Sequence, residues 1–276
     1  MQSTEIQKQL AIDQHSVQAE QFAERYRSLN EEAYRSCFAY SRKRLSALLD
    51  SCLPERGDGL RLLDVGCGTG HQMASLAEKG FEVSGLDGSQ EMLEQARANN
   101  PGADIRQADV ESIPFADASF DFILCIEVLR YLPDSSRCIR EMARVLRPGG
   151  VCFATAAPLL NLNGYWLVNR IANLVRIGDL VRLRQFFTTS RRLRQEFVSA
   201  GFREPSVSGV YIGPVNWVER LAPKALPPIL KSWEPIDAAL ADKPGLREFS
   251  NMFLVDAVKL TAETQHPAQH PWNNHR

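Results

Sequence analysis

The sequence has no surplus of positive charge. Lysine and arginine together number 32 and aspartate and glutamate 33 in a chain of 276 residues, so the formal net charge is −1. A protein that binds nucleic acid mainly through its phosphates usually carries a large positive excess. The charge balance therefore argues against general nucleic-acid binding.

Cysteine pairs with metal-site spacing are also absent. The six cysteines are scattered, and no two of them stand in a CxxC pattern. Scattered cysteines of this kind usually serve as small apolar side chains in a protein from a reducing compartment. They do not have the spacing expected of disulfides or zinc ligands. We therefore expect no metal site.

A signal-peptide core and a membrane span are missing as well. The first residues, MQSTEIQKQLAIDQ, lack the apolar core that a secretory signal needs. The longest stretch without a charge, residues 148–169, is interrupted by prolines, glycines and asparagines and is not a clean span. These absences predict a cytoplasmic protein.

What the sequence does contain is a regular alternation of strands and helices. Five short apolar strands, with helices of about 10 to 15 residues between them, are predicted at 60–66, 81–87, 103–109, 119–126 and 151–157. The pattern resumes with a helix at 189–200 and strands near 206–211 and 252–260. This order predicts an α/β fold with a mostly parallel seven-stranded sheet and helices on both faces.

Composition divides the chain further. Helical periodicity predicts an N-terminal helical cap at 1–53, ahead of a core at 54–262. The core is interrupted at 158–187 and at 212–249, and the second interruption contains six prolines. The His- and Pro-rich tail 263–276 is predicted to be disordered.

The most informative stretch is DVGCGTG, residues 64–70, where the first strand turns into a helix. Its glycines let the backbone turn sharply and approach a ligand at the edge of an open α/β sheet. A nicotinamide-binding loop usually reads GxGxxG, whereas this loop reads GxGxG and has His71 where the last glycine would fall. Asp64 suits a cationic ligand, or a loop whose amides it orders, better than two phosphates.

Carboxylates also stand at the ends of the next two strands. Asp87, followed by Gly88 and Ser89, can accept hydrogen bonds from both hydroxyls of a ribose. Asp109 is in place to accept one from the exocyclic amine of an adenine. Together with the glycine loop, these residues indicate a site for an adenosine-containing ligand.

Three acidic strand ends in a row, with a glycine loop at the first, resemble the class I S-adenosylmethionine-dependent methyltransferases of the small-molecule type. The matching motifs are LLDVGCGTG, GLDGSQEMLEQAR, DVESIPFADASFDFILCIEVLRYL and RVLRPGG. They cover about 60–157, and element order extends the resemblance to 188–211 and 250–260. It implies a Rossmann-like fold, helical lid insertions and S-adenosyl-L-methionine as the cofactor.

The resemblance also implies which residues bind that cofactor. The glycine loop would surround its methionine portion, the second strand end its ribose and the third its adenine. Ile126 would line the sulfonium side through its backbone, and Tyr26 or Tyr34 would lie over the cofactor. The implied set is Asp64, Gly66, Cys67, Gly68, Asp87, Gly88, Met92, Asp109, Val110, Ile126 and Tyr26.

The base for proton removal is less well marked. Many small-molecule members of the family have a histidine after the fourth strand, where this chain reads VLRY at 128–131. Glu127 and Tyr131 are the remaining candidates, although Tyr131 could equally pack under a lid. His71 is interpreted as a helix cap or surface residue, and His15 stands near the N-terminus. Methyltransferases that act on the amino group of a nucleic-acid base carry a Pro-Pro-aromatic signature after the fourth strand. This chain lacks it, which again argues against a nucleic-acid substrate.

One inserted segment, 159–195, is strongly basic. It carries seven arginines, one aspartate and no lysine, a net charge of +6, which leaves −7 for the rest of the chain. Its apolar residues recur near helical spacing and predict one or two amphipathic helices. They could be a solvated helix pair, or a lid that contacts an amphipathic or acidic acceptor or an anionic membrane surface. The stretch 212–249 is a second candidate for lining the substrate site.

The sequence thus predicts methyl transfer to an oxygen or nitrogen, less readily a carbon, of a small or medium-sized metabolite. Aromatic, quinone, sugar and lipid-linked acceptors all agree with the pattern. Three alternatives stay open: a peptide or protein side-chain methyltransferase, an NAD(P)-dependent dehydrogenase, and a catalytically silent cofactor-binding protein.

Overall fold

The computed structural model describes residues 2–21, 24, 33–164, 185–213 and 215–261, and every structural statement below concerns these residues. Tyr26, most of the insertion 158–187 and the tail 263–276 lie outside them. The helices expected in that insertion and the disorder expected in the tail therefore stay predictions.

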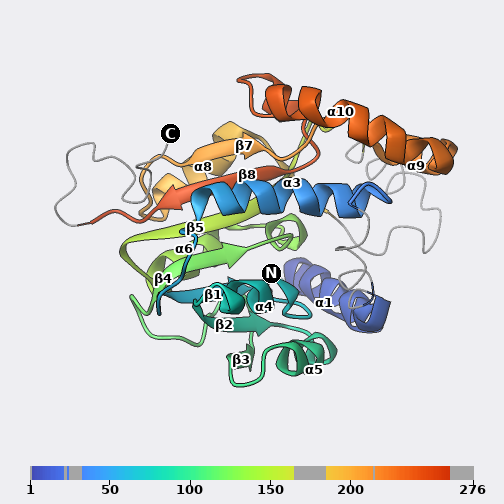
Figure 1. Cartoon of the computed structure of the whole chain (residues 1–276). Helices are drawn as coiled ribbons and strands as arrows, with labels where there is room; N and C mark the ends of the chain where they lie inside the picture. The colour runs from blue at the N-terminus through green and yellow to red at the C-terminus, as the bar shows by residue number, and fades with distance from the viewer. Residues whose placement is uncertain (1, 22–23, 25–32, 165–184, 214, 262–276) are drawn as a thin grey trace.

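The fold is built on one mixed sheet with the strand order β3-β2-β1-β4-β5-β8-β7 (Figure 1). The strands of this path are β1 (Arg61–Val65), β2 (Glu82–Asp87), β3 (Asp104–Gln107), β4 (Phe120–Cys125), β5 (Leu146–Pro158), β7 (Ser206–Gly209) and β8 (Phe253–Val258). The first five pair in parallel, whereas β8 is antiparallel to both β5 and β7. A two-residue strand, β6 (Phe187–Thr188), pairs with the end of β5. The predicted α/β fold with a mostly parallel seven-stranded sheet is confirmed, with this one short strand in addition.

The fifth strand begins earlier than its apolar run suggested. It starts at Leu146 instead of residue 151 and includes the Pro-Gly-Gly sequence at 148–150. The pairing of β4 with β5 shifts register between Phe120 and Phe122, so the extra residues form an irregularity of the strand instead of a separate turn. A Cβ at Gly150 would lie 2.9 Å from the Asp121 carbonyl oxygen, which explains why glycine is required there.

Helices cover both faces of the sheet. They are α1 (Gln2–Val17), α3 (Cys37–Cys52), α4 (His71–Glu78), α5 (Gln90–Asn99), α6 (Ser136–Val145), α8 (Ser190–Ser199), α9 (Val215–Leu221) and α10 (Leu226–Leu240), with short 3₁₀ turns η2 (Leu129–Tyr131), η3 (Pro223–Ala225) and η4 (Leu246–Phe249). In the described part of the chain, no helix has both the length and the apolar character to cross a membrane.

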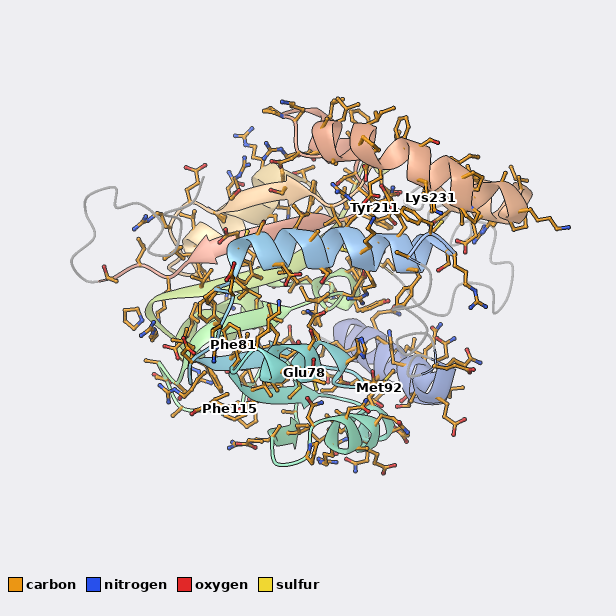
Figure 2. All side chains as sticks on the ribbon, viewed as in Figure 1. Glu78, Phe81, Met92, Phe115, Tyr211 and Lys231 are labelled. Carbon is orange, nitrogen blue, oxygen red and sulfur yellow. The ribbon has the colours of Figure 1, made fainter. Side chains whose placement is uncertain are left out.

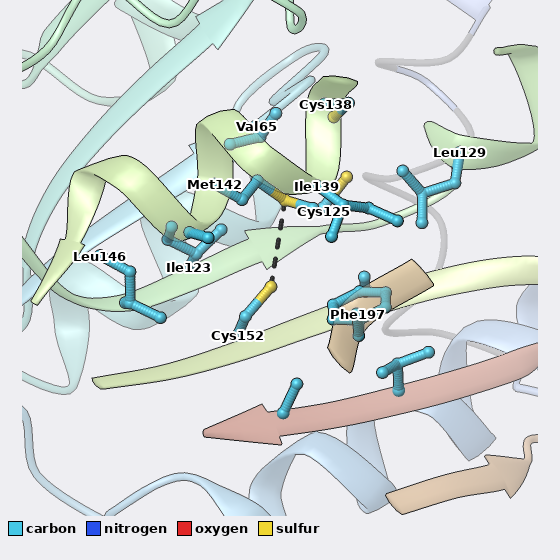
Figure 3. Packing of buried hydrophobic residues seen from close by; sticks show 14 of the residues in the cluster. Val65, Ile123, Cys125, Leu129, Cys138, Ile139, Met142, Leu146, Cys152 and Phe197 are labelled. Carbon is cyan, nitrogen blue, oxygen red and sulfur yellow. Dashed lines mark hydrogen bonds between the residues drawn. The ribbon is translucent and has the colours of Figure 1, made fainter. Parts of the chain in front are cut away.

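The core has two layers because successive strand residues point to opposite faces. In β4, Ile123 packs with α6 and α8, whereas Phe122 packs with α3, α9 and α10. Figure 3 shows the first layer, where the Cys152 thiol lies 3.9 Å from the Met142 sulfur. Burial on both faces is what the continuous apolar strands of the sequence predict.

The Pro-rich stretch 212–249 is mostly helical, which its composition did not reveal. It forms α9, η3, α10 and η4. Pro227 and Pro228 stand in the first turn of α10, where an N–H would have no partner within the helix. Only Pro235 interrupts the interior of α10. These helices lie above α3 in Figure 1 and complete the layer on that face.

Two of the helices near the N-terminus, α1 and α3, occupy different places. α3 packs on the sheet, whereas α1 lies beside α5 near the carboxyl ends of β2 and β3 (Figure 1). The Ser16 and Ser89 hydroxyl oxygens are 2.8 Å apart, which joins the end of α1 to the start of α5. The first helix of the chain is therefore brought to the edge of the sheet where strand ends meet.

Candidate active site

A cavity of about 810 Å³ lies at the carboxyl ends of β1, β2 and β4. Its volume is within the range of small-molecule sites. α1, α3 and α9 contribute the side chains that enclose it. Figure 2 labels two of its lining residues, Met92 on α5 and Tyr211, whose ring packs edge-on against Tyr40 of α3.

Three amide groups of the glycine loop between β1 and α4 donate hydrogen bonds to acceptors within the protein. Gly66 N and Cys67 N donate to the Leu86 carbonyl at 2.8 and 2.9 Å. Gly68 N donates to the Asp87 carboxylate at 3.0 Å. A loop that binds phosphate points such amides at its ligand. The loop is therefore not arranged for a pyrophosphate.

The shape of this loop requires glycine at one position and leaves space at another. Gly66 has a φ of +75°, and a Cβ there would overlap the Val128 side chain. Gly68 has a φ of +52° and lines the cavity, and a Cβ there would meet no atom within 4 Å. The backbone at Gly68 is thus open to a bound molecule.

Asp64 is a buried carboxylate at the end of β1. It is 4% exposed and lines the cavity. Burial and the neighbouring Asp87 raise the pKa of Asp64 to about 7. Arg42, which also lines the cavity, opposes this rise without cancelling it. A buried acid of this kind calls for a cationic partner in the cavity.

Asp87 ends β2 and organises the turn into α5. Its Oδ1 accepts a hydrogen bond from Ser89 N at 2.9 Å, and its Oδ2 accepts the one from Gly68 N. The Ser89 hydroxyl in turn caps α5 by accepting from Met92 N at 3.1 Å, as the sequence predicts. The carboxylate oxygens retain further lone pairs for hydroxyl donors.

Asp109, which follows β3, is bound by a lysine of the N-terminal helix. Lys8 Nζ lies 2.7 Å from Asp109 Oδ2 and 2.7 Å from Glu111 Oε2. The Lys8 and Glu111 side chains are only 9% and 7% exposed. Although burial lowers it, hydrogen bonds to these carboxylates hold the pKa of Lys8 above its ordinary value. α1 is thereby fixed over the third strand end.

Glu127 follows β4 in a strained backbone conformation, with a φ of +65°. Its N–H donates to the Thr155 hydroxyl at 2.7 Å, and its carboxylate pairs with Arg130. Burial, the largest single effect, would raise the pKa of Glu127, but Arg130 and Arg42 are the main groups that together outweigh it, so the pKa is lowered. The Glu127 carboxylate therefore stays ionised and is held by its neighbour.

The cavity brings most of the predicted site residues together. They are Asp64, Gly66, Cys67, Gly68, Asp87, Gly88, Met92, Asp109, Val110, Ile126, Glu127 and Tyr131. Tyr26 lies outside the described residues. Tyr34 does not line the cavity, and its hydroxyl bonds to Glu234 instead.

Several lining residues were not found from the sequence. Lys8, Ile12 and His15 come from α1, Arg42 comes from α3, and Arg220 comes from α9. No motif marks them, because they reach the cavity only through packing of helices that are distant in sequence. His71 also lines the cavity and is half-buried, with its pKa lowered by burial and by Arg42, so it is not a surface residue.

The chain is similar to known methyltransferases. A family model described as "Methyltransferase domain" matches residues 63–154. The ubiquinone biosynthesis O-methyltransferase of Proteus mirabilis is 30% identical over 191 residues, which cover 65% of this chain and 77% of the relative. The chain belongs to the class I S-adenosylmethionine-dependent methyltransferases.

Other relatives of this methyltransferase are matched over shorter stretches. The malonyl-[acyl-carrier protein] O-methyltransferase of Erwinia pyrifoliae is 36% identical over 142 residues, which cover 50% of this chain and 53% of the relative. The bifunctional protein BioHC of Cellvibrio japonicus is 39% identical over 141 residues, half of this chain and 28% of the relative. The chain spans about half or less of the length of these curated relatives.

Solved structures share the fold of this methyltransferase. An S-adenosylmethionine-dependent methyltransferase from Mesorhizobium loti has a TM-score of 0.55 and 23% identity, covering 78% of this chain and 98% of that one. The [4+2]-cyclase SpnF has a TM-score of 0.55 and 21% identity, covering 84% and 85%. The same fold therefore carries more than one chemistry, and the activity has to be argued from the site.

The residues of the methyltransferase cavity suit the family's cofactor. S-adenosylmethionine carries positive charge on its sulfonium and amino groups, and two carboxylates, the buried Asp64 and the half-buried Asp87, stand beside the glycine loop. The amides of Gly66, Cys67 and Gly68 are already bonded within the protein, so these three are not available to an anion. The two carboxylates thus match the cationic groups of the cofactor.

Proposed function

We propose that this chain transfers the methyl group of S-adenosylmethionine to an oxygen of a small or medium-sized metabolite. The observation that carries the proposal is the pair of carboxylates, the buried Asp64 and the half-buried Asp87, which meet at the glycine loop. Family membership supports S-adenosylmethionine as the cofactor. A nitrogen acceptor is the nearest variant of the same chemistry.

In this proposal each end of the cofactor has its own partner in the chain. Asp64 accepts from the amino group, and Asp87 accepts from the ribose hydroxyls. Asp109 and Val110 frame the adenine, with Met92 and Gly88 beside the ribose. The backbone at Ile126 and Gly68 borders the sulfonium and methionine portions. Tyr26 stays a predicted cover for the cofactor.

The protein's contribution to the reaction is mainly positioning. The bound cofactor supplies a methyl group activated by a positively charged sulfur. The cavity has to hold the acceptor in line with that methyl and to exclude water, and orientation alone can provide much of the rate. α1, α3 and α9 enclose the space in which an acceptor would lie.

Two considerations favour an oxygen on a metabolite. The printed names of the relatives include O-methyltransferases that act in ubiquinone biosynthesis and on malonyl-[acyl-carrier protein]. The part of the cavity wall that α3 and α9 form contains Arg42, Asn216 and Arg220, which suit an acceptor with polar or acidic groups. A lid at 159–195 that contacts such an acceptor or an anionic membrane stays a prediction.

Ligand-induced thermal stabilisation tests the cofactor assignment. The full chain is melted with S-adenosylhomocysteine, with S-adenosylmethionine and with NADH, each in excess, because a ligand that binds only the folded state raises Tm. We expect the first two to raise Tm and NADH to leave it unchanged. Stabilisation by NADH alone would overturn the proposal in favour of a dehydrogenase.

Release of S-adenosylhomocysteine then tests the reaction. A catechol, a quinol, a malonyl thioester and a peptide mixture are offered as acceptors with S-adenosylmethionine. Turnover of a metabolite probe supports the proposal, and turnover of the peptides alone would assign a side-chain methyltransferase. Tight S-adenosylhomocysteine binding without release on any acceptor would indicate a catalytically silent protein.

A further inference from the structure

The N-terminal helix places a histidine inside the cavity. His15 stands in the last turn of α1 and lines the same cavity as Asp87 and Glu127. Its ring packs edge-on against Tyr131, with ring centroids 5.0 Å apart and an interplanar angle of 73°. Tyr131 belongs to η2, the turn that follows β4. His15 therefore lies beside the segment after the fourth strand, where many small-molecule members of the family have a histidine and this chain has none.

A hydrogen bond defines which ring nitrogen of His15 is basic. Nδ1 lies 2.6 Å from the Ala11 carbonyl oxygen, one turn earlier in α1. A carbonyl oxygen can only accept, so Nδ1 must carry the proton and donate it. In the neutral ring the lone pair then belongs to Nε2, which can take up a proton. The helix itself thus selects the tautomer that a general base needs.

Two carboxylates that line the cavity are electrostatically coupled to His15. Burial raises the pKa of Asp87, and the charge of His15 is among the effects that oppose this shift. The same charge helps to lower the pKa of Glu127, behind the larger effect of Arg130. The surrounding ionisable groups are Asp87 from β2, Glu127, Arg130 and Tyr131 after β4, Glu91 from α5 and Lys8 on α1 itself. Asp87 and Glu127 therefore lie close enough to His15 for their charges to interact with it.

The other candidates for the base are less suitable. Glu127 is paired with Arg130, and its lowered pKa makes it a weak base. The ordinary pKa of a tyrosine hydroxyl is about 10, whereas that of an imidazole is about 6.5. His71 opens α4 next to the glycine loop, the part of the cavity assigned to the methionine portion of the cofactor.

We propose that His15 is the general base for methyl transfer to an acceptor hydroxyl, supplied by the N-terminal helix in place of a histidine after the fourth strand. The inference rests on the proposed function. The acceptor oxygen gives its proton to His15 Nε2 while it forms the bond to the methyl carbon. The methyl–sulfur bond breaks with its electron pair left on sulfur, and water later takes the proton from His15. The products are a methyl ether, S-adenosylhomocysteine and a proton.

Two acceptor probes separate a base from a structural residue. The hydroxyl of 3,4-dihydroxybenzoate must lose a proton on methylation, whereas the carboxylate of malonyl-N-acetylcysteamine is already ionised. We expect His15→Gln to lower the rate on the first probe at least about 100-fold, the usual range for a general base, and to spare the second. The rate of the variant on the first probe should also lose the rise with pH that titration of an imidazole produces.

His71→Gln is the matched control, because it removes the other histidine that lines the cavity. It should change S-adenosylhomocysteine affinity, measured by calorimetry, while the pH dependence of the rate at saturating cofactor is kept. If His15→Gln retains the rate and pH profile of the wild type on 3,4-dihydroxybenzoate, the inference is overturned. If the wild type fails to bind S-adenosylhomocysteine, the proposed function itself is wrong.

If the wild type does not turn over 3,4-dihydroxybenzoate, nitrogen NMR tests whether His15 Nε2 can accept a proton. The full chain with S-adenosylhomocysteine bound is labelled at its histidines, and the His15 signals are assigned by their loss in His15→Gln. At about pH 8, where an ordinary imidazole is neutral, we expect the proton on Nδ1. A proton on Nε2 at that pH would overturn the inference, since the nitrogen could not then accept one.

Discussion

Lys8 Nζ lies 2.7 Å from Asp109 Oδ2 and equally 2.7 Å from Glu111 Oε2, so one lysine of the first helix joins two carboxylates that follow the third strand. The contact spans about a hundred positions of sequence, with separations of 101 and 103. It fixes α1 over the part of the cavity that we assign to the adenine. The proposed cofactor site is therefore closed by a segment outside the core motifs.

Lys8→Met should weaken S-adenosylhomocysteine binding several-fold, about 1 kcal/mol, because α1 loses its ion pair and two carboxylates lose their cation. Calorimetry at low and high salt measures the effect, and the salt dependence of binding should change in the variant. Lys79→Met is the control, since Lys79 pairs with Asp50 on the surface away from the cavity. Equal affinity of Lys8→Met and wild type would mean that α1 does not close the site.

Cofactor affinity should rise with pH through about 7, because Asp64 has to be ionised to accept from a cationic amino group. Binding at about pH 6 should therefore release a proton, which calorimetry in buffers of different ionisation enthalpy detects. Asp64→Asn should abolish the proton release and lower the affinity. Binding that proceeds without any proton exchange in the wild type would contradict the assignment of Asp64.

The same carboxylate should make the stability of the free protein depend on pH. Its pKa is raised from 3.8 in the ordinary state to about 7 in the folded protein, so the folded chain holds more protons than the unfolded chain in this window. Stability then falls as pH rises from about 4 to 7. Asp64→Asn should flatten this decline in a urea-unfolding series, and an unchanged decline would attribute it to other groups.

Asp87→Ala should lower S-adenosylhomocysteine affinity at least about 10-fold, because the ribose hydroxyls lose an acceptor and Gly68 N and Ser89 N are left without theirs. Calorimetry gives the affinity, and a thermal melt shows whether the fold remains. Asp104→Ala serves as the matched control, since Asp104 lies on the neighbouring strand and pairs with Arg106 at the surface. If Asp87→Ala binds S-adenosylhomocysteine with wild-type affinity, the assignment of Asp87 to the ribose is wrong.

Gly88→Ala should displace α1, because the new Cβ would lie 2.7 Å from Ile12 Cδ1 and 2.9 Å from Ile12 Cγ1. We expect several-fold weaker S-adenosylhomocysteine binding, about 1 kcal/mol, and partial recovery when Ile12→Ala is added to make room. Calorimetry on both single variants and the double variant measures this coupling. Additive losses without recovery would show that Gly88 and Ile12 act independently.

Much of the core could be predicted because its signals are local. The apolar strand ending in Asp64 and the glycine turn after it lie within ten residues, so their chemistry and geometry can be interpreted together. The same holds for Asp87 with its capping Ser89. The helices of the Pro-rich stretch were missed, because prolines in the first turn of α10 resemble those of a loop unless the helix boundary is known.

By itself, the sequence determined the α/β core, the family resemblance and the acidic strand ends, since these depend on short-range patterns of apolar, glycine and carboxylate residues. Only the tertiary structure decided what closes the cavity. Lys8 meets Asp109, and His15 meets Tyr131, through the packing of a helix that is distant in sequence from both partners. The pattern of α1 specifies a helix but not the surface against which it packs, because that choice depends on shape and charge brought together by folding.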